Sequence, residues 1–296
     1  MTEVLIAGVA VAAIVMQVAE LPRRAEKYRA TDAMITVGGC AANAAVAMAR
    51  HGGRARLAVR LGRDAIGDLI VAALAAEGVD LSLSDRRDGA RSSFSSVHVD
   101  AAGERQIVNF RGAGLADTLD LSAAPRPGAV LADNRWPMLT AAALARARSW
   151  GVPGIVDAEA PVEAEALRGA SHIAFSMQGL AAYAPGLAVA DALGRARDDF
   201  AAWVAVTDGA RGVWFTEGAG VSHVPAFPVA AVDTLAAGDI WHGVFALRLA
   251  EGAEERSAIR FANAAAALKC RAFGGAAACP DRSATELFLK ETAPCN

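Results

Sequence analysis

The stretch Val232-Asp233-Thr234-Leu235-Ala236-Ala237-Gly238-Asp239 decides how the rest of the chain is interpreted. The apolar residues before it, 227–232, are typical of a strand. After it, Ile240, Val244 and Leu247 recur with helical spacing, which predicts an amphipathic helix. The small residues between the two can turn their backbone N–H groups together at the start of that helix. Because the first amides of a helix are unpaired and its dipole favours negative charge, this turn predicts an anion site.

The stretch also ends in a carboxylate, Asp239, directly beside the predicted anion site. An aspartate placed there can take a proton from an attacking hydroxyl while the backbone of Ala236, Ala237 and Gly238 holds phosphoryl oxygens. The alternative is a tight turn whose aspartate serves the helix start alone, where Asp is common as a cap. The stretch by itself leaves both interpretations open.

A second motif begins at the glycine pair Gly38-Gly39 and continues through Asn43 into a run of small residues that ends at Arg50. This order is typical of a strand, a tight turn and a helix that packs closely on a sheet. A glycine pair alone also fits an ordinary loop, so the motif gains its meaning from the rest of the chain.

Together the two motifs resemble the two signatures of the ribokinase-like (PfkB) family of carbohydrate kinases, Gly-Gly-x-x-x-Asn and Asp-Thr-x-Gly-Ala-Gly-Asp. They stand in the family's order and about two hundred residues apart. The resemblance implies that Gly38 and Gly39 let the backbone approach a sugar to which Asn43 hydrogen-bonds. It implies that the turn formed by Ala236, Ala237 and Gly238 is the anion hole and that Asp239 is the catalytic base. The family usually has Gly at the position of Ala236.

The remaining chain predicts an α/β fold. An apolar strand at 4–8, and strands alternating with helices from residue 129 onward, predict a doubly wound, mostly parallel sheet. Alternating segments at 93–99 and 105–110, separated by a turn, predict a hairpin and hence a small separate sheet. The resemblance implies a single kinase domain over 1–296 with a β lid from about 10–36 and 91–113. Since such lids are often dimer surfaces, it also implies a homodimer.

The nucleotide-binding residues are implied by the resemblance only. Thr207, Gly209 and Gly212 match the family's Thr-x-Gly-x-x-Gly turn beside the ATP phosphates, although a glycine-containing β-turn is the simpler interpretation of these residues alone. Asn263 and Gly275 match the helix and loop beside adenine. The implied cofactors are ATP and Mg²⁺, with Mg²⁺ bridging the β- and γ-phosphates.

At the substrate end the chain departs from the family pattern. Ala13 stands where many members have an Asp that binds two sugar hydroxyls, and residues 176–179 lack the family's Asn-x-x-Glu. A nearer resemblance is to bacterial 6-deoxy-6-sulfofructose kinases, in which a Lys, an Asn and an Arg grip the sulfonate; Lys27, Asn109 and Arg135 match them. Two cationic donors and one neutral donor suit an anion. Ordinary surface or salt-bridged side chains are the alternative.

The expected function is therefore ATP-dependent phosphorylation of a sugar hydroxyl, with a ketose bearing an anionic group at C6 as the implied substrate. The departures at Ala13 and Ala236 leave a second hypothesis open, a catalytically weakened sugar-binding or regulatory protein on the same fold. A nucleoside kinase would leave the implied anion-binding side chains without a role.

Composition narrows the remaining alternatives. A net charge of −3 and the lack of a basic run argue against nucleic acid as a partner. The first apolar run, 4–18, is too short to span a bilayer. Four cysteines without metal-ligand spacing predict reduced thiols, no protein-held metal centre and a cytoplasmic location.

Overall fold

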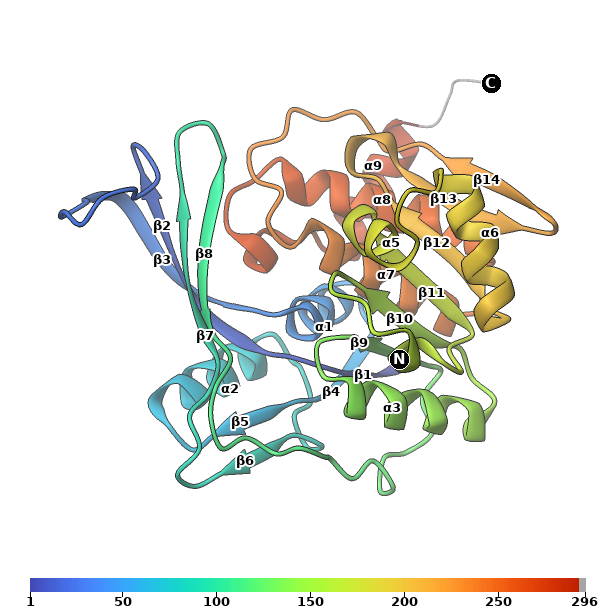
Figure 1. The fold of residues 1–296 in the computed structure, drawn as a ribbon, viewed down its shortest axis with the longest axis horizontal. Coiled ribbons are helices and arrows are strands. Elements are labelled where there is room, and N and C mark those ends of the chain that lie inside the picture. Colours follow the sequence, from blue (N-terminus) through green and yellow to red (C-terminus); the bar gives the residue numbers. More distant parts are fainter. Residues whose placement is uncertain (293–296) are drawn as a thin grey trace.

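A computed structural model describes residues 1–292, so the last four residues of the predicted 1–296 domain lie outside the described residues. A large central sheet forms the body, and a smaller sheet stands away from it (Figure 1). The central sheet has the strand order β14 (Gly220–Val224), β13 (Val213–Glu217), β12 (Trp203–Thr207), β11 (His172–Ser176), β10 (Gly154–Ala158), β9 (Ala129–Asp133), β1 (Glu3–Ala7) and β4 (Arg54–Ala58).

The strands from β4 to β12 pair in parallel, and β13 and β14 add an antiparallel edge. Helices cover both faces, which is why these strands are nearly continuous apolar runs. Side chains such as Ile6 pack on one face against α1 (Cys40–Arg50), α7 (Ala237–Ala250) and α8 (Glu255–Cys270). Their neighbours, such as Leu5, pack on the other face against α3 (Pro137–Trp150). The predicted doubly wound, mostly parallel α/β sheet is confirmed.

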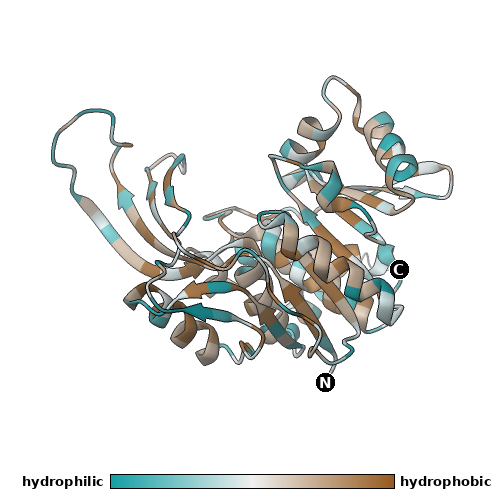
Figure 2. Cartoon of the chain, turned by 60° about the horizontal axis from the view of Figure 1, so that its bottom comes forward, coloured by the Kyte–Doolittle hydropathy of each residue, from teal (hydrophilic) through white to brown (hydrophobic). Residues whose placement is uncertain are grey.

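Further helices complete the body: α2 (Ala65–Ala76), α4 (Ala164–Leu167), α5 (Met177–Tyr183), α6 (Val189–Phe200), α9 (Arg282–Glu291) and the 3₁₀ turns η1 (Gly209–Arg211) and η2 (Gly275–Ala278). A short strand pair, β5 (Arg60–Gly62) and β6 (Asp85–Arg87), lies beside α2 (Figure 1). In Figure 2 the apolar colour follows the strands and inner helix faces, while hydrophilic residues gather at the loops.

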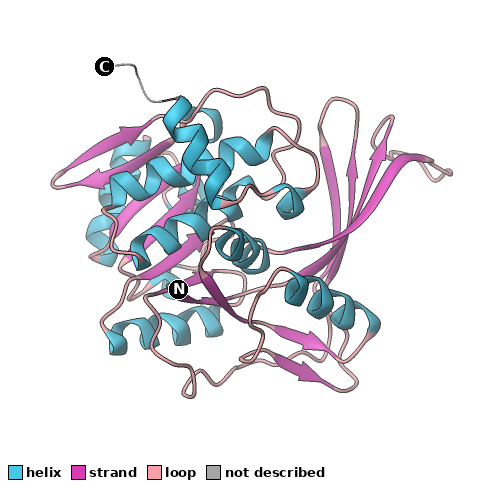
Figure 3. Ribbon diagram, turned by 180° about the vertical axis from the view of Figure 1, so that it is seen from behind, coloured by secondary structure: helices cyan, strands magenta, loops and turns pink. Residues whose placement is uncertain are grey.

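The smaller sheet, called the lid sheet below, has the order β3 (Ala30–Gly38), β2 (Val11–Val18), β7 (Phe94–Val99) and β8 (Arg105–Phe110). The β7–β8 hairpin is antiparallel as predicted, and β2 joins it in parallel. Seen from behind, these strands project away from the helix-covered body (Figure 3). The predicted small separate sheet is confirmed, and its strands come from the two regions that the sequence indicated.

The strand predicted at 227–232 is wrong, because the structure has a loop there. The edge position beside β13 is already taken by β14. The loop instead packs on helices: the N–H groups of Val232 and Asp233 donate to the Cys270 carbonyl at the end of α8. The Phe227 ring meets Phe288 of α9 edge-on. An apolar run therefore resembled a strand although it packs against helices and pairs with no strand among the described residues.

Candidate active site

A cavity of about 560 Å³ lies between the lid sheet and the carboxyl ends of the central strands. Its wall includes Val9 after β1, Arg135 after β9 and Glu159 after β10, together with the first residues of α1 and α7. Ligands of open parallel sheets bind at this edge because the loops that follow the strands converge there. The site predicted from the sequence is therefore expected in this cavity.

The start of α7 forms one end of this cavity. Ala236 precedes the helix with φ 64°, in the left-handed region, and no side chain caps the helix. A Cβ atom added to Gly238 would have none of the surrounding described atoms within 4 Å, so the space beside this residue is open. The first amides of a helix have no partner within it and its dipole favours an anion. This end thus has the open, amide-lined geometry of a phosphate cradle.

A buried ion pair anchors the loop that leads into the cradle. The Lys269 side chain is fully buried, and its Nζ donates to both the carboxylate and the carbonyl oxygen of Asp233 at 2.8 Å. The amides of Leu235, Gly274 and Gly275 also donate to the Asp233 carboxylate. Burial raises the pKa of Asp233, but these hydrogen bonds outweigh it and hold that pKa below its usual range. The turn is therefore tied to α8 and to the η2 loop.

Asp239 lies one residue beyond Gly238, with its carboxylate at the cavity wall. Asn43 Nδ2 of α1 donates to Asp239 Oδ2 at 2.6 Å. Protein atoms packed around Asp239 desolvate it and raise its pKa to about 6; the Asn43 hydrogen bond opposes this rise, and the charge of Glu159 adds to it. A general base works best with a pKa near the operating pH. The pKa of Asp239 is therefore shifted toward the value that suits a general base.

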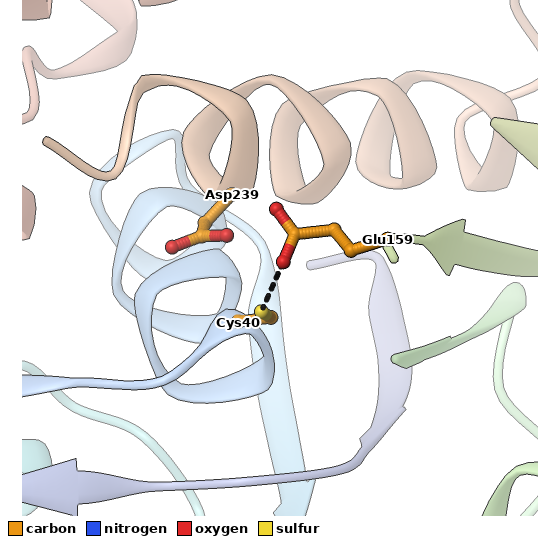
Figure 4. Close-up of side chains that lie close together, drawn as sticks. All are labelled: Cys40, Glu159 and Asp239. Atoms are coloured by element: carbon orange, nitrogen blue, oxygen red, sulfur yellow. Dashed lines mark hydrogen bonds between the residues drawn. The ribbon is translucent and has the colours of Figure 1, made fainter. Parts of the chain in front are cut away.

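Glu159, Cys40 and Asp239 come from three elements and meet at this wall, with one ligand atom of each within 4.8 Å of the others (Figure 4). The Cys40 thiol donates to Glu159 Oε2 at 3.7 Å. Arg135 donates to the same oxygen and, at 2.7 Å, to the Ala160 carbonyl. The charge of Arg135 is therefore shared with a carboxylate inside the cavity.

A buried carboxyl beneath this wall holds three elements in place. Asp133, at the end of β9, accepts hydrogen bonds from the amides of Val9, Ala41 and Arg135. Burial raises the pKa of Asp133 to about 6 although these bonds oppose the shift. A Cβ atom at Gly8 would lie 2.1 Å from its carboxylate, so only glycine fits there. Asp133 thereby fixes Arg135 and the start of α1 relative to the sheet.

The lid sheet forms the other end of the cavity. Alternate residues of β8 and its continuation face inward, namely Arg105, Ile107, Asn109 and Arg111, as the period of two in a strand requires. Asn109 Nδ2 donates to Ser95 Oγ at 2.9 Å. This end is therefore lined by cationic and amide side chains.

The predicted residues that line the cavity are Gly38, Gly39, Asn43, Asn109, Arg135, Ala236, Gly238, Asp239 and Gly275. Ala237, the first residue of α7, does not line the cavity, and its amide donates to the Thr234 carbonyl at 3.3 Å. Gly39 has φ 95°, and a Cβ there would lie 2.6 Å from the Val9 carbonyl oxygen, so the tight turn needs glycine. The sugar and phosphate motifs, distant in sequence, are thus brought to one cavity.

Other predicted residues do not lie at this cavity. Lys27 is exposed on the loop that joins the long strands β2 and β3, and this loop projects at the tip of the lid sheet (Figure 1). The structure therefore does not bring Lys27 to Asn109 and Arg135 within one chain. Of the three predicted anion-binding residues, Asn109 and Arg135 line the cavity and Lys27 does not. Arg135 is also ion-paired to Glu159.

The predicted nucleotide residues also lie outside the cavity lining, except Gly275. Thr207 ends β12, and Gly209 and Gly212 form the turn that follows, with φ 52° and 101°. Asn263 is buried: it accepts from Trp241 Nε1 at 2.8 Å and donates to the Pro225 carbonyl at 3.1 Å. Because its side chain is used inside the fold, its placement beside adenine remains a prediction from resemblance.

Magnesium and nucleotide phosphates fit the cavity on chemical grounds. Mg²⁺ takes oxygen ligands and usually keeps several waters while it binds substrate phosphates. The soft Cys40 thiol does not suit it, so Cys40, Glu159 and Asp239 are not an all-protein magnesium cage. The open amide cradle beside the Asp239 carboxylate suits an ion that arrives on the phosphates.

Sequence analysis missed Glu159, Asp133 and the lid arginines Arg105 and Arg111. The first two follow or end buried parallel strands, which is the position where ligand-facing residues gather. The arginines share the period of two with Asn109, so a strand pattern drawn through that residue would have found them.

Comparisons with known proteins agree with this geometry. Residues 1–282 match the family described as pfkB family carbohydrate kinase. A ribokinase of Bacillus subtilis is 29% identical over 276 residues, which cover 90% of this chain and 92% of that protein. The crystal structure of an Agrobacterium tumefaciens protein, provisionally assigned as a ribokinase, is 38% identical with a TM-score of 0.93, covering 98% of each chain.

A structure of Arabidopsis thaliana ribokinase complexed with ribose and ATP shares the fold, with a TM-score of 0.82 at 24% identity over 98% of this chain and 99% of that one. Among residues 1–292, none of the helices has the length and apolar character needed to cross a bilayer. The family match spans nearly the whole chain and contains the motif at 233–239. The chain therefore belongs to the PfkB family of carbohydrate kinases, phosphotransferases with an alcohol group as acceptor.

Proposed function

We propose that the protein transfers the γ-phosphoryl group of ATP to a sugar hydroxyl, with Asp239 as the general base. The observation that carries this proposal is the position of Asp239, a carboxylate with a raised pKa between the amide cradle and the lid. A base at that point can reach a hydroxyl whose oxygen faces the γ-phosphorus. The proposed site of action is the cytoplasm, where ATP and Mg²⁺ are both supplied.

In this reaction Asp239 takes the proton of the sugar hydroxyl as the oxygen attacks the γ-phosphorus in line. A P–O bond forms to the sugar, the bond to the β-phosphate oxygen breaks, and ADP leaves. The backbone of residues 236–239 holds the phosphoryl oxygens, and Asn43 keeps the Asp239 carboxylate aimed at the cavity. Mg²⁺ would arrive with the ATP phosphates beside the Asp239 carboxylate and would supply neutralisation of their charge. The lid sheet keeps water from competing as acceptor.

The substrate class proposed here is a ketose with an anionic group at C6, such as 6-deoxy-6-sulfofructose. Support comes from the lid end of the cavity, where Asn109, Arg105 and Arg111 face inward and Arg60 lines the wall. Since Glu159 already pairs with Arg135, the cationic side chains of the lid are better candidates for the anion than Arg135 is. An anion held at the lid end leaves the other end of the sugar facing Asp239.

The test is a coupled ADP-release assay with ribose, fructose, fructose 6-phosphate and 6-deoxy-6-sulfofructose. Asp239→Asn keeps the shape of the side chain but removes the base, so kcat should fall by about 10²–10⁴-fold. Binding of the sugar, measured by calorimetry, should stay within several-fold. Near-normal ADP release by Asp239→Asn would refute the assignment of the base. A preference of the unmutated protein for neutral sugars would refute only the anionic substrate.

A second candidate function is a sugar-binding or regulatory protein with weakened catalysis. Two observations favour it: Ala13 offers the cavity only a methyl group, and Ala236 holds a left-handed conformation that suits glycine better. Saturable sugar binding without ADP release above background, for every sugar in the panel, would favour this candidate over the kinase.

A homodimer through the lid sheet is also proposed. Ile35 on β3 and Val108 on β8 are 62% and 65% exposed, and both belong to the same cross-strand row of the sheet. Apolar side chains gathered on an outer sheet face favour contact with a second copy. Sedimentation should give a dimer that Val108→Glu converts to a monomer, while a monomeric unmutated protein would contradict the proposal.

A further inference from the structure

The cavity has a specific shortage of hydrogen-bond acceptors on its lid side. Sugar hydroxyls are donors that need acceptors, and carboxylates accept most strongly. The position of the family's sugar-binding Asp is occupied by Ala13, whose neighbours across the strands are Thr36 and Ser95. Among the described residues that line the cavity, Asp239 and Glu159 are the two carboxylates. Asp239 is already assigned to the acceptor hydroxyl, so Glu159 is the one that remains for the rest of the sugar.

Glu159 is held so that one of its oxygens stays available. Arg135 and the Cys40 thiol both donate to Oε2. No hydrogen bond among residues 1–292 uses Oε1, although the side chain lines the cavity and is only about one-third exposed. A carboxylate gripped through one oxygen presents the other in a fixed direction, which lowers the entropy cost of binding a hydroxyl.

A second, independent observation also points to a ligand at this wall. The Asn43 side chain is 6% exposed, and its Nδ2 donates to Asp239. Its Oδ1 is buried and has no partner within residues 1–292, although Asn43 belongs to the lining of the same cavity. A buried acceptor without a donor is costly, and a bound hydroxyl would satisfy it. The wall thus presents unused acceptors suited to a polyhydroxylated molecule.

We propose that Glu159 is a substrate-binding residue that sets specificity: its Oε1 accepts a hydrogen bond from the hydroxyl next to the one that Asp239 deprotonates. The substrate is therefore a sugar with two neighbouring hydroxyls, one the acceptor and the other recognised by Glu159. The spacing agrees, since ligand atoms of Glu159 and Asp239 lie within 4.8 Å and adjacent sugar hydroxyls can bridge such a pair (Figure 4). Arg135 then acts through Glu159 as a positioning residue. This inference rests on the proposed kinase function.

Glu159→Gln tests the proposal with minimal change in shape. In this variant the donors Arg135 and Cys40 would keep the amide oxygen, so the amide NH₂ would face the sugar and could not accept its hydrogen bond. The sugar KM, for the panel sugar with the highest kcat/KM, should rise roughly tenfold or more. The ATP KM should stay within about twofold. Glu163→Gln, an exposed residue on the same loop, is the matched control and should change neither.

Deoxy analogues of that sugar provide a measurement that would not change if Glu159 had only a structural role. Removing the hydroxyl next to the acceptor should lower kcat/KM of the unmutated enzyme roughly tenfold but change Glu159→Gln by less than about twofold, because the contact is already lost. If Glu159→Gln fails to fold, Glu159→Asp, which withdraws the carboxylate by one methylene, serves for both measurements.

Two outcomes would overturn the proposal: a sugar KM within about twofold of the unmutated value, or full additivity between the variant and every deoxy analogue. Failure of the proposed function is distinguishable from this. If no panel sugar releases ADP with the unmutated protein, calorimetric binding of the same sugars to both forms still compares their affinities. Equal affinities would then refute the role of Glu159 as well.

Discussion

The two ends of the cavity are built in different ways. At the phosphoryl end, the turn before α7 is tied by the Asp233–Lys269 pair and by the amides of Leu235, Gly274 and Gly275, so its backbone geometry is rigidly specified. At the lid end, side chains on an exposed, projecting sheet face the cavity. Arg105 bridges the two ends by donating to Thr234 Oγ1 at 3.3 Å.

The difference shows how one fold can keep its chemistry while its substrate varies. The phosphoryl end uses backbone amides held by a buried ion pair, together with one base, so its chemistry does not depend on the side chains at the lid end. Sugar recognition depends on individual side chains, and there the cavity is lined by Ala13, which offers only a methyl group, and by the carboxylate of Glu159. Changes at the anchored end should therefore abolish function, and changes at the lid end should redirect it.

The largest effect is expected from breaking the anchor. Lys269→Met would leave Asp233 charged and partly buried without its partner, and losing one member of a buried pair typically costs about 3–5 kcal/mol. Chemical denaturation should show this loss of stability, and kcat should fall because the cradle loosens. Lys290→Met, at an exposed position, is the control and should be neutral. Equal stability of the two variants would show that the anchor contributes nothing.

The pH dependence of kcat sharpens the contrast, because it reports on the ionisation of Asp239 at the anchored end. The pKa of Asp239 is raised to about 6, so the carboxyl is ionised above that pH and protonated below it. Only the ionised form can take the proton, so kcat should fall roughly tenfold for each pH unit below about 6. In Glu159→Gln, which removes a charge that raises this pKa, the acid limb should move to lower pH. An unshifted limb would mean that another group controls it.

A smaller effect is expected at the lid end. Arg111→Ala should raise the KM for 6-deoxy-6-sulfofructose about fivefold, the value of one well-exposed charge contact, and leave fructose unchanged. Steady-state kinetics with both sugars make the comparison, and Arg148→Ala, remote from the cavity, is the control. If the two sugars respond alike, the lid arginine contributes no anion selectivity.

The smallest effect is expected at Ala236, and it tests how strongly catalysis depends on the backbone conformation of the turn before α7. Ala236 and Ala201 are the non-glycine residues with positive φ among those described, at 64° and 50°. Replacing either by glycine relieves strain but adds freedom to the unfolded chain, so stability should change by less than about 1 kcal/mol in both. Ala236→Gly alone should raise kcat, about twofold, since only Ala236 lines the cradle. A similar change in kcat for Ala201→Gly would dissociate the effect from the site.

Much of this site could be predicted because its signals are local. Gly39 and Ala236 occupy backbone conformations that their own turns impose, and Asp239 sits at a helix start announced by the apolar spacing after it. The apolar runs of the central strands likewise reflect burial on both faces, which the pattern alone indicates. The loop at 227–232 was mistaken for a strand because an apolar pattern does not reveal whether a segment packs on helices or pairs with a sheet.

By itself the sequence determined the fold class, most of the order of its elements and the turn before α7, because backbone preferences and burial depend on neighbouring residues. Tertiary structure alone decided which charges meet. It separated Lys27 from Asn109, paired Arg135 with Glu159, and brought Glu159, which follows β10, to Asp239 of α7. Side-chain electrostatics act over a few ångströms of space, whatever the sequence separation. The substrate end of the cavity is consequently a property of the folded molecule.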